Sequence, residues 1–228
     1  MMLSMKRIVQ AGFMAGLLVT GVALADVDPL KPAPTAESKK VDASGPSQLI
    51  ESSAQILLAG IDARRAEFHK DPTGLYELVA NTLLPHFDTP YAAQLVLGPH
   101  WRTATPEQRK RFVEAFYKSL LYTYGDAMVD FTGDRLKVLP TKVADTDERA
   151  TVRSEVKRSN GTKVSVNYSL RKINGEWKAW DVVIDGISYV KSYREDYGAE
   201  VQQKGLDAVI QRLESKAQTA KSAKAKTT

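Results

Sequence analysis

The hydrophobic residues of this chain change their spacing near Gly133, and that change limits the fold to a few classes. Before it, large apolar residues recur every three or four positions, which is the spacing of amphipathic helices. After it, apolar and polar residues alternate, as in half-buried strands. Helical spacing returns after Gly186. This order predicts an α+β fold, in which N-terminal and C-terminal helices pack on one face of an antiparallel sheet.

Two Asn-Gly pairs interrupt the strand region; the first predicts a tight type I′ hairpin, and the second predicts another turn. They are Asn160-Gly161 and Asn174-Gly175. With a short strand over Leu136 and Val138, the alternation predicts a four-stranded meander that has one apolar and one polar face. The apolar face beside the first turn carries small side chains: Ala150, Val152, Ser154, Val156, Val164 and Val166.

The clearest helix start is Thr105-Pro106-Glu107-Gln108, which has the form of a capping box with proline at the first helical position. The long helix that follows carries large apolar residues, among them Phe116, Leu120 and Tyr124. These residues either fill the space left by the small sheet residues or leave a gap for an apolar ligand. Complementary packing is the commoner outcome. Further helix starts are predicted at Asp71-Pro72, Asp88 and Ser188.

The first 25 residues have the three-part plan of a secretory signal peptide. Lys6-Arg7 supplies the charged start, Ile8 to Val22 is an apolar run, and the small residues Ala23 and Ala25 suit signal peptidase. The run is shorter than the roughly 20 residues of a membrane-spanning helix. We predict cleavage after Ala25, and the bacterial character of the sequence makes the compartment the periplasm.

Composition divides the remaining chain into three parts. Residues 26–46 are rich in proline and predict a linker. Residues 47–215 carry the helix and strand patterns of one α+β domain, and residues 216–228 predict a Lys-rich disordered tail.

The formal net charge of +5 does not predict a nucleic-acid surface, because much of it lies outside the predicted domain. Residues 1–25 and 216–228 hold six of the 32 basic residues and no acidic residue; subtracting the six leaves 26 basic against 27 acidic residues. The absence of cysteine excludes thiol chemistry and Cys-ligated metals. The three histidines fall in unrelated contexts, so we expect neither a metal nor a cofactor.

Two pairs of charged residues are candidates for chemistry or for binding. Asp181 and Asp185 share a strand face at a separation of roughly 13 Å, which exceeds the carboxylate spacing of glycosidases. Arg102 and Arg109 flank the start of the long helix, where they either form a solvated surface or dock an acidic partner or lipid headgroup.

Four short segments, spread over most of the predicted domain, carry a family resemblance. They are Leu95–Gly98 with Trp101, Ala104–Arg109 with Phe112, Thr123–Gly125, and Trp177 with Asp181–Ser188. In these segments the chain resembles the MlaC family of periplasmic lipid-binding proteins, also called the toluene-tolerance or auxiliary transport family. The resemblance runs from about Gln48 to Leu213.

The resemblance implies a soluble phospholipid shuttle that keeps the outer leaflet of the outer membrane poor in phospholipid. Its implied partners are an outer-membrane lipoprotein–porin complex and an inner-membrane ABC transporter, contacted through the periplasmic substrate-binding subunit of that transporter. The implied fold is an α+β body with an antiparallel sheet and a deep apolar pocket for the acyl chains. The resemblance therefore favours a ligand-binding gap between the long helix and the sheet over a fully packed core, and it implies no cofactor.

We expect the pocket wall to combine residues of the sheet with residues of the long helix. The sheet residues are Val152, Val156, Val164, Val166, Tyr168, Val182, Ile184 and Ile187, and the helix residues are Phe116, Leu120 and Tyr124. Ile187→Glu is expected to fold but to lose lipid, because a buried carboxylate is costly beside acyl chains. Arg102 and Arg109 are the expected docking residues.

Two other classes of protein remain as alternatives. One is a small periplasmic enzyme that uses Asp181 or Asp185 as a general base between helices and sheet. The other is a lipoprotein carrier or chaperone, which is disfavoured because such carriers are dominated by strands.

Overall fold

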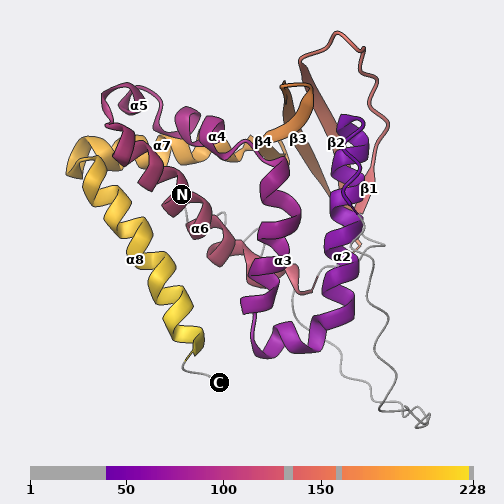
Figure 1. Ribbon diagram of the computed structural model, residues 1–228, viewed down its shortest axis with the longest axis horizontal. Helices are drawn as coiled ribbons and strands as arrows, with labels where there is room; N and C mark the ends of the chain where they lie inside the picture. Colours follow the sequence, from indigo (N-terminus) through magenta and orange to yellow (C-terminus); the bar gives the residue numbers. More distant parts are fainter. Residues whose placement is uncertain (1–39, 131–135, 158–160, 226–228) are drawn as a thin grey trace. The chain divides into compact units, whose positions relative to one another are not determined.

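The computed structural model describes residues 40–130, 136–157 and 161–225, which form helices and an antiparallel sheet (Figure 1). The predicted α+β class is therefore confirmed. The predicted signal peptide, most of the predicted linker, Gly133 and Asn160 lie outside the described residues. The helices before the sheet are α2 (Pro46–Lys70), α3 (Thr73–Leu83), the 3₁₀ turn η1 (Leu84–His86), α4 (Thr89–Leu97), α5 (His100–Thr103) and α6 (Pro106–Met128).

The sheet is an antiparallel meander of five strands in the order β1-β2-β3-β4-β5. The sequence predicted four of them. The fifth pairs only two residues, and it exists because Asp185 (φ 47°) and Gly186 (φ 82°) make a tight turn back onto β4. The strands are β1 (Leu136–Val138), β2 (Arg149–Lys157), β3 (Lys163–Ile173), β4 (Glu176–Ile184) and β5 (Ile187–Ser188).

Strand register places the predicted apolar residues on one face of the sheet. Val152 pairs with Tyr168, which pairs with Val182, and directly paired residues share a face. The same register joins Leu136 of β1 to Val156 and to Val164. The turn predicted at Asn174-Gly175 is present, and its φ angles of 50° and 83° are those of a type I′ hairpin.

Three of the four predicted helix starts are made by side-chain hydrogen bonds; at α3 the N-cap is Pro72, not the predicted Asp71, and it makes no side-chain capping hydrogen bond. At α6, the Gln108 N–H donates to Thr105 Oγ1 over 3.1 Å, and the Thr105 N–H donates to Gln108 Oε1 over 2.9 Å. Asp88 accepts from the Tyr91 N–H at α4, and Ser188 accepts from the Lys191 N–H at α7 (Tyr189–Lys204). These contacts satisfy N–H groups that a helix start leaves without intrahelical acceptors.

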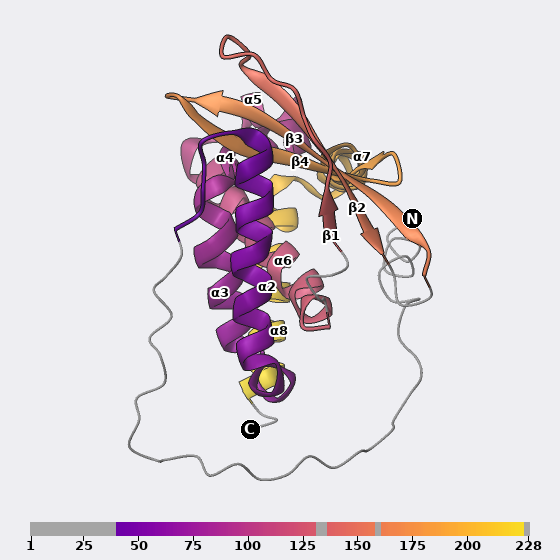
Figure 2. The same ribbon diagram turned by 90° about the vertical axis from the view of Figure 1, so that its right-hand side faces the viewer.

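Three hydrophobic clusters hold the domain together. The helical cluster joins α4, α6, α7 and α8 (Leu206–Ala225) around Phe112 and Tyr197. The sheet cluster joins α2 to the sheet through Leu49, Ile50 and Val152, and the hairpin cluster joins α2 to α3. The long helix α6 thus packs mainly on α8, whereas α2 lies against β1 and β2 (Figure 2).

Both ends of the folded body extend beyond the predicted domain limits. Val41 and Ala43 pack against the sheet cluster, although the predicted linker runs to residue 46. Helix α8 continues to Ala225, into the segment predicted to be a disordered tail. Alanine, lysine and glutamine favour helix, and no glycine or proline follows Gly205 to end it. Among the described helices, none has the length and hydrophobicity that crossing a membrane requires.

Candidate functional site: an apolar cavity

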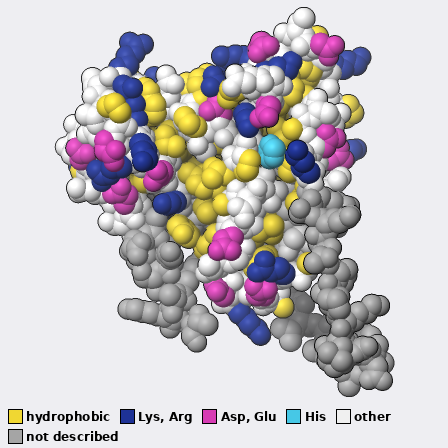
Figure 3. Space-filling view, viewed as in Figure 1, with side chains coloured by type: hydrophobic (Ala, Val, Ile, Leu, Met, Phe, Trp, Pro, Cys, Tyr) yellow, Lys and Arg dark blue, Asp and Glu magenta, His cyan; other side chains and the backbone are white. Residues whose placement is uncertain are grey.

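An apolar cavity of about 230 Å³ lies between α3, α4, α6, α7 and β4. In the space-filling view, hydrophobic side chains gather over the region between α3 and α6 (Figure 3). The wall is made by Val79, Leu83, Leu84, Phe87, Ala92, Phe116, Tyr117, Leu120, Leu121, Tyr124, Gly125, Met128, Trp180, Asp181, Val182, Tyr189, Val190 and Tyr193.

Gly125 allows α3 and α6 to approach each other beside this cavity. A Cβ atom at this position would lie 2.8 Å from Cε1 of Tyr76 on α3, closer than real contacts allow. A glycine inside a helix costs about 1 kcal/mol relative to alanine. The close approach of Tyr76 is the structural reason for that glycine in α6.

Asp181 is the one charged residue of the described wall, and its carboxylate already has hydrogen-bond partners. Asp181 is 4% exposed; one oxygen accepts from Ser188 Oγ over 2.6 Å and the other from the Val190 N–H over 3.0 Å. Both donors belong to the start of α7. The carboxylate therefore joins β4 to α7. Because both of its oxygens already accept a hydrogen bond, it is poorly placed to bind a ligand in the cavity.

Asp185 is also used by the fold. Its carboxylate accepts from the Ser165 N–H over 3.1 Å, and its own N–H donates to the Ser165 carbonyl over 2.9 Å. Of the two candidate general bases, Asp181 lies on β4 and bonds to the start of α7, and Asp185 lies in a turn. Each carboxylate thus has partners within the fold. Among the described residues, no three His, Asp or Glu side chains form a group that could hold a metal ion.

Tyrosine side chains line the end of the cavity that faces α7. The hydroxyl groups of Tyr124 and Tyr193 lie 2.9 Å apart, within hydrogen-bond distance. Burial raises the pKa of Tyr117 to about 12, and burial followed by the hydrogen bond to Tyr124 raises the pKa of Tyr193. These hydroxyls stay protonated at physiological pH, so they remain hydrogen-bond donors in an otherwise apolar wall.

The structure brings four of the eleven predicted pocket residues into this cavity. They are Phe116, Leu120 and Tyr124 of α6 and Val182 of β4. The other seven lie on the same sheet face outside the cavity wall: Val152, Val156, Val164, Val166, Tyr168, Ile184 and Ile187.

Val152 and Ile187 differ most from the predicted setting. Val152 is fully buried in the sheet cluster, where it packs under α2. Ile187 is 44% exposed in β5. A carboxylate in place of Ile187 would stay hydrated, so the burial penalty assumed for Ile187→Glu does not apply at this position.

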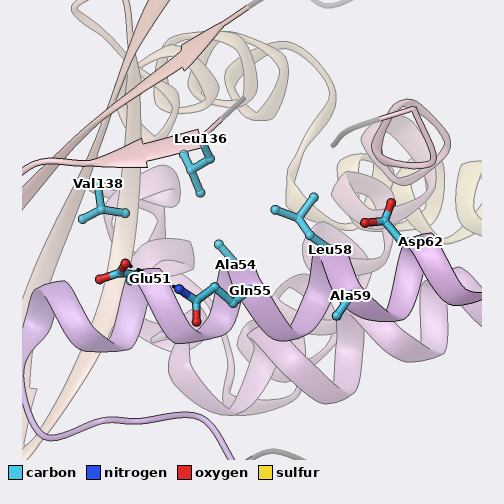
Figure 4. Close-up of a pocket in the computed structure, with 8 residues that line it drawn as sticks. All are labelled: Glu51, Ala54, Gln55, Leu58, Ala59, Asp62, Leu136 and Val138. Atoms are coloured by element: carbon cyan, nitrogen blue, oxygen red, sulfur yellow. Dashed lines mark hydrogen bonds between the residues drawn. The ribbon is translucent and has the colours of Figure 1, made fainter. Parts of the chain in front are cut away.

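A second groove, of about 300 Å³, lies at the β1 edge of the same sheet face (Figure 4). Ala54 and Leu58 of α2 point towards Leu136 and Val138 of β1 across it. Glu51, Gln55 and Asp62 add polar groups to its rim. The cavity at Val182 of β4 and the groove at β1 therefore border the same face of the sheet at different strands.

The predicted docking residues differ in how far they are free to bind a partner. Arg102 is exposed in α5. Arg109 donates to the Trp101 carbonyl over 2.9 Å and to the Arg102 carbonyl over 3.3 Å, and its guanidinium lies over the Trp101 ring. Arg109 thus satisfies carbonyl groups at the end of α5, which explains why a cation is present near the start of α6.

Several wall residues were missed by the sequence reasoning. Val79 and Leu83 of α3 line the cavity although they were not predicted to, and the same holds for Trp180, Tyr189 and Tyr193, which crowd around Gly186 in the sequence. That crowding is the sequence signal that marks this end of the cavity.

The fold and the cavity define a class: an α+β protein with an internal space suited to an apolar ligand. The family model described as MlaC protein matches residues 51–215. The chain belongs to the MlaC family.

Curated relatives and a solved structure agree with this assignment. The toluene tolerance protein ttg2D of Pseudomonas putida is 32% identical over 168 residues, covering 73% of this chain and 78% of that protein. The intermembrane phospholipid transport system binding protein MlaC of Haemophilus influenzae is 25% identical over 177 residues, which cover 76% of this chain and 83% of that protein. A phospholipid-binding protein of Ralstonia solanacearum, solved with a phospholipid, has the same fold, with a TM-score of 0.68 at 24% identity, covering 75% of this chain and 96% of that one.

Proposed function

We propose that this protein is a periplasmic phospholipid carrier that buries acyl chains in the cavity between α3, α4, α6, α7 and β4. The observation that carries the proposal is the wall itself, whose one described charge is held by the start of α7. Membership in the MlaC family supports it, as do the names of the relatives.

The energetic reason for enclosure is the cost of exposing acyl chains to water. Two chains with about 30 methylenes in total forfeit on the order of 24 kcal/mol in water, at about 0.8 kcal/mol per methylene. The cavity of about 230 Å³ is smaller than the roughly 300 to 1,000 Å³ of ordinary ligand pockets. A two-chain lipid therefore requires the walls of the cavity to separate.

The cellular role follows from the family and from the N-terminal segment. The signal-peptide pattern of residues 1–25 supports export to the periplasm. There the carrier would exchange phospholipid between an outer-membrane lipoprotein–porin complex and an inner-membrane ABC transporter, through the periplasmic substrate-binding subunit of that transporter. Arg102 is the better candidate for docking, because Arg109 is engaged within the fold.

Mass spectrometry of an organic extract tests the proposal directly. The chain from Asp26 onward is purified from a bacterial periplasm, extracted with organic solvent, and its lipid is quantified. Phospholipid in a stoichiometric amount is expected. An extract without phospholipid, together with no uptake of labelled phospholipid from vesicles, would contradict the carrier function. That result would favour the alternative of a small periplasmic enzyme or a protein with a fully packed core.

A pair of variants on one strand tests the location of the lipid. Val182→Glu places a carboxylate in the cavity wall beside Asp181, so we expect lipid content to fall sharply. Val183→Glu is the matched control, because the adjacent residue points to the opposite face of β4 and is similarly exposed. Equal lipid content in the two folded variants would remove the cavity as the binding site.

A further inference from the structure

The cavity wall contains two buried hydrogen-bond donors that its apolar character does not explain. Tyr117 Oη and Trp180 Nε1 are inaccessible to solvent and have no hydrogen-bond partner among the described residues. Both side chains line the cavity, and a ligand reaches the two atoms once the walls separate, as entry of a two-chain lipid requires. Leaving a buried polar group unpaired is costly, so such groups are uncommon in native proteins and each requires an explanation.

The position of Trp180 is itself unusual. Ser169 of β3 pairs with Asp181 and Leu170 pairs with Ala179, so Trp180 is an extra residue of β4 at a β-bulge. Bulges redirect a side chain relative to the regular alternation of a strand, and they are enriched beside functional sites. Here three consecutive residues at the bulge, Trp180, Asp181 and Val182, line the cavity, which regular alternation would not allow.

The hydrogen-bonding groups of the wall that remain free are donors, so they favour a ligand that accepts hydrogen bonds. The indole N–H of Trp180 is a donor only, and the raised pKa of Tyr117, about 12 because of burial, keeps its hydroxyl hydrogen in place. The hydroxyls of Tyr124 and Tyr193 bond to each other, which leaves one further hydroxyl hydrogen for a ligand. The carboxylate of Asp181, an acceptor, is taken up by Ser188 and Val190.

We propose that Tyr117 Oη and Trp180 Nε1 bind the ester carbonyl oxygens that join the acyl chains of a phospholipid to its glycerol. This inference rests on the proposed carrier function and names the part of the lipid that the cavity recognises. Ester carbonyls accept hydrogen bonds, carry no charge and lie where the apolar chains begin. A phosphate or a fatty-acid carboxylate fits poorly, because no Lys or Arg lines the described wall and Asp181 carries a negative charge.

Matched ester and ether lipids test the proposal. A diacyl phospholipid and its dialkyl ether analogue, with the same headgroup and chain length, compete with a fluorescent phospholipid for the purified protein. We expect the diester to bind at least about tenfold more tightly, because the ether leaves the buried donors unpaired. Trp180→Phe and Tyr117→Phe should each lower this ratio several-fold. Tyr122→Phe, on the same helix but outside the cavity wall, is the control and should keep the wild-type ratio.

The outcomes separate this inference from the function on which it rests. If the wild-type protein binds both lipids equally well, ester recognition is wrong while the carrier stands. If it binds neither lipid, the carrier itself is wrong. A wild-type preference that both phenylalanine variants retain would overturn the assignment to Tyr117 and Trp180, and the two variants are independent should one of them fail to fold.

Discussion

Raising the pH from 10 to 12 should destabilise this protein through the buried tyrosines between α6, α7 and α8. Tyr197 is 3% exposed, and its ring stacks on Tyr193 with the centroids 5.5 Å apart. Burial raises the pKa of Tyr197 from 10.0 to about 12, although the positive charge of Arg212 acts in the opposite direction. The unfolded chain therefore loses this proton near pH 10, whereas the folded chain keeps it up to about pH 12.

The sign and size of the effect follow from this difference in pKa. A raised pKa for an acid that is neutral when protonated stabilises the fold below pH 10, and that stabilisation is lost as the pH rises towards 12. One tyrosine contributes up to about 1.4 kcal/mol per pH unit, so Tyr197 contributes about 2.7 kcal/mol over the two-unit shift. Urea unfolding followed by circular dichroism at pH 8 to 12 measures the loss.

The Tyr197→Phe variant isolates this contribution. It should lose about 2 kcal/mol less than the wild-type protein between pH 10 and 12, because it has no proton to release at this position and both ends of this interval are midpoints of the titration. Phe116→Leu is the control, since it disturbs the same aromatic cluster without removing an ionisable group. Identical losses in the wild-type protein and Tyr197→Phe would refute the reasoning.

Four further substitutions test the fold and the surface. Thr105→Ala removes the hydrogen bond to the Gln108 N–H and should cost about 1 kcal/mol in urea unfolding, and an unchanged midpoint would argue against the capping box. Phe112→Ala should cost about 3 to 5 kcal/mol, because the ring is fully buried, while the folded fraction keeps its lipid since Phe112 lies outside the cavity wall. Arg102→Glu should weaken binding to purified membrane complexes and leave lipid content intact; equal affinity would exclude docking at this site. Arg109→Glu should also lower stability, which Arg102→Glu should not.

Local patterns in the sequence predicted the elements well because their causes are local. The capping box at Thr105 and the turn at Asn174-Gly175 depend on residues within four positions, and the structure makes both. The alternation in β2 and β3 predicted which residues share a sheet face, since side chains alternate strictly along a strand. The short strand β5 was missed because two residues carry no period.

The position of the cavity was harder to predict because it depends on which helix covers the sheet. Periodicity marked α6 as strongly apolar, but it does not say that α6 packs on α8 while α2 covers Val152. The sheet residues of the predicted wall therefore share the correct face, yet only Val182 reaches the cavity. The bulge at Trp180 is likewise invisible in the alternation, because it depends on the pairing with β3.

The cavity lies at a boundary between hydrophobic clusters, which bears on how a carrier of this kind admits its ligand. Val79 of its wall belongs to the hairpin cluster, whereas Phe116 and Tyr193 belong to the helical cluster. The fully buried side chains of Phe68 and Phe112 lie inside the separate clusters and outside the wall. Moving α3 away from α6 would therefore widen the cavity and leave the helical cluster intact, but it would break the contacts of Leu121 and Met128 with the hairpin cluster. For the proposed carrier, acyl chains that enter between α3 and α6 would cover the apolar surface that this movement exposes, and their burial would offset the lost contacts.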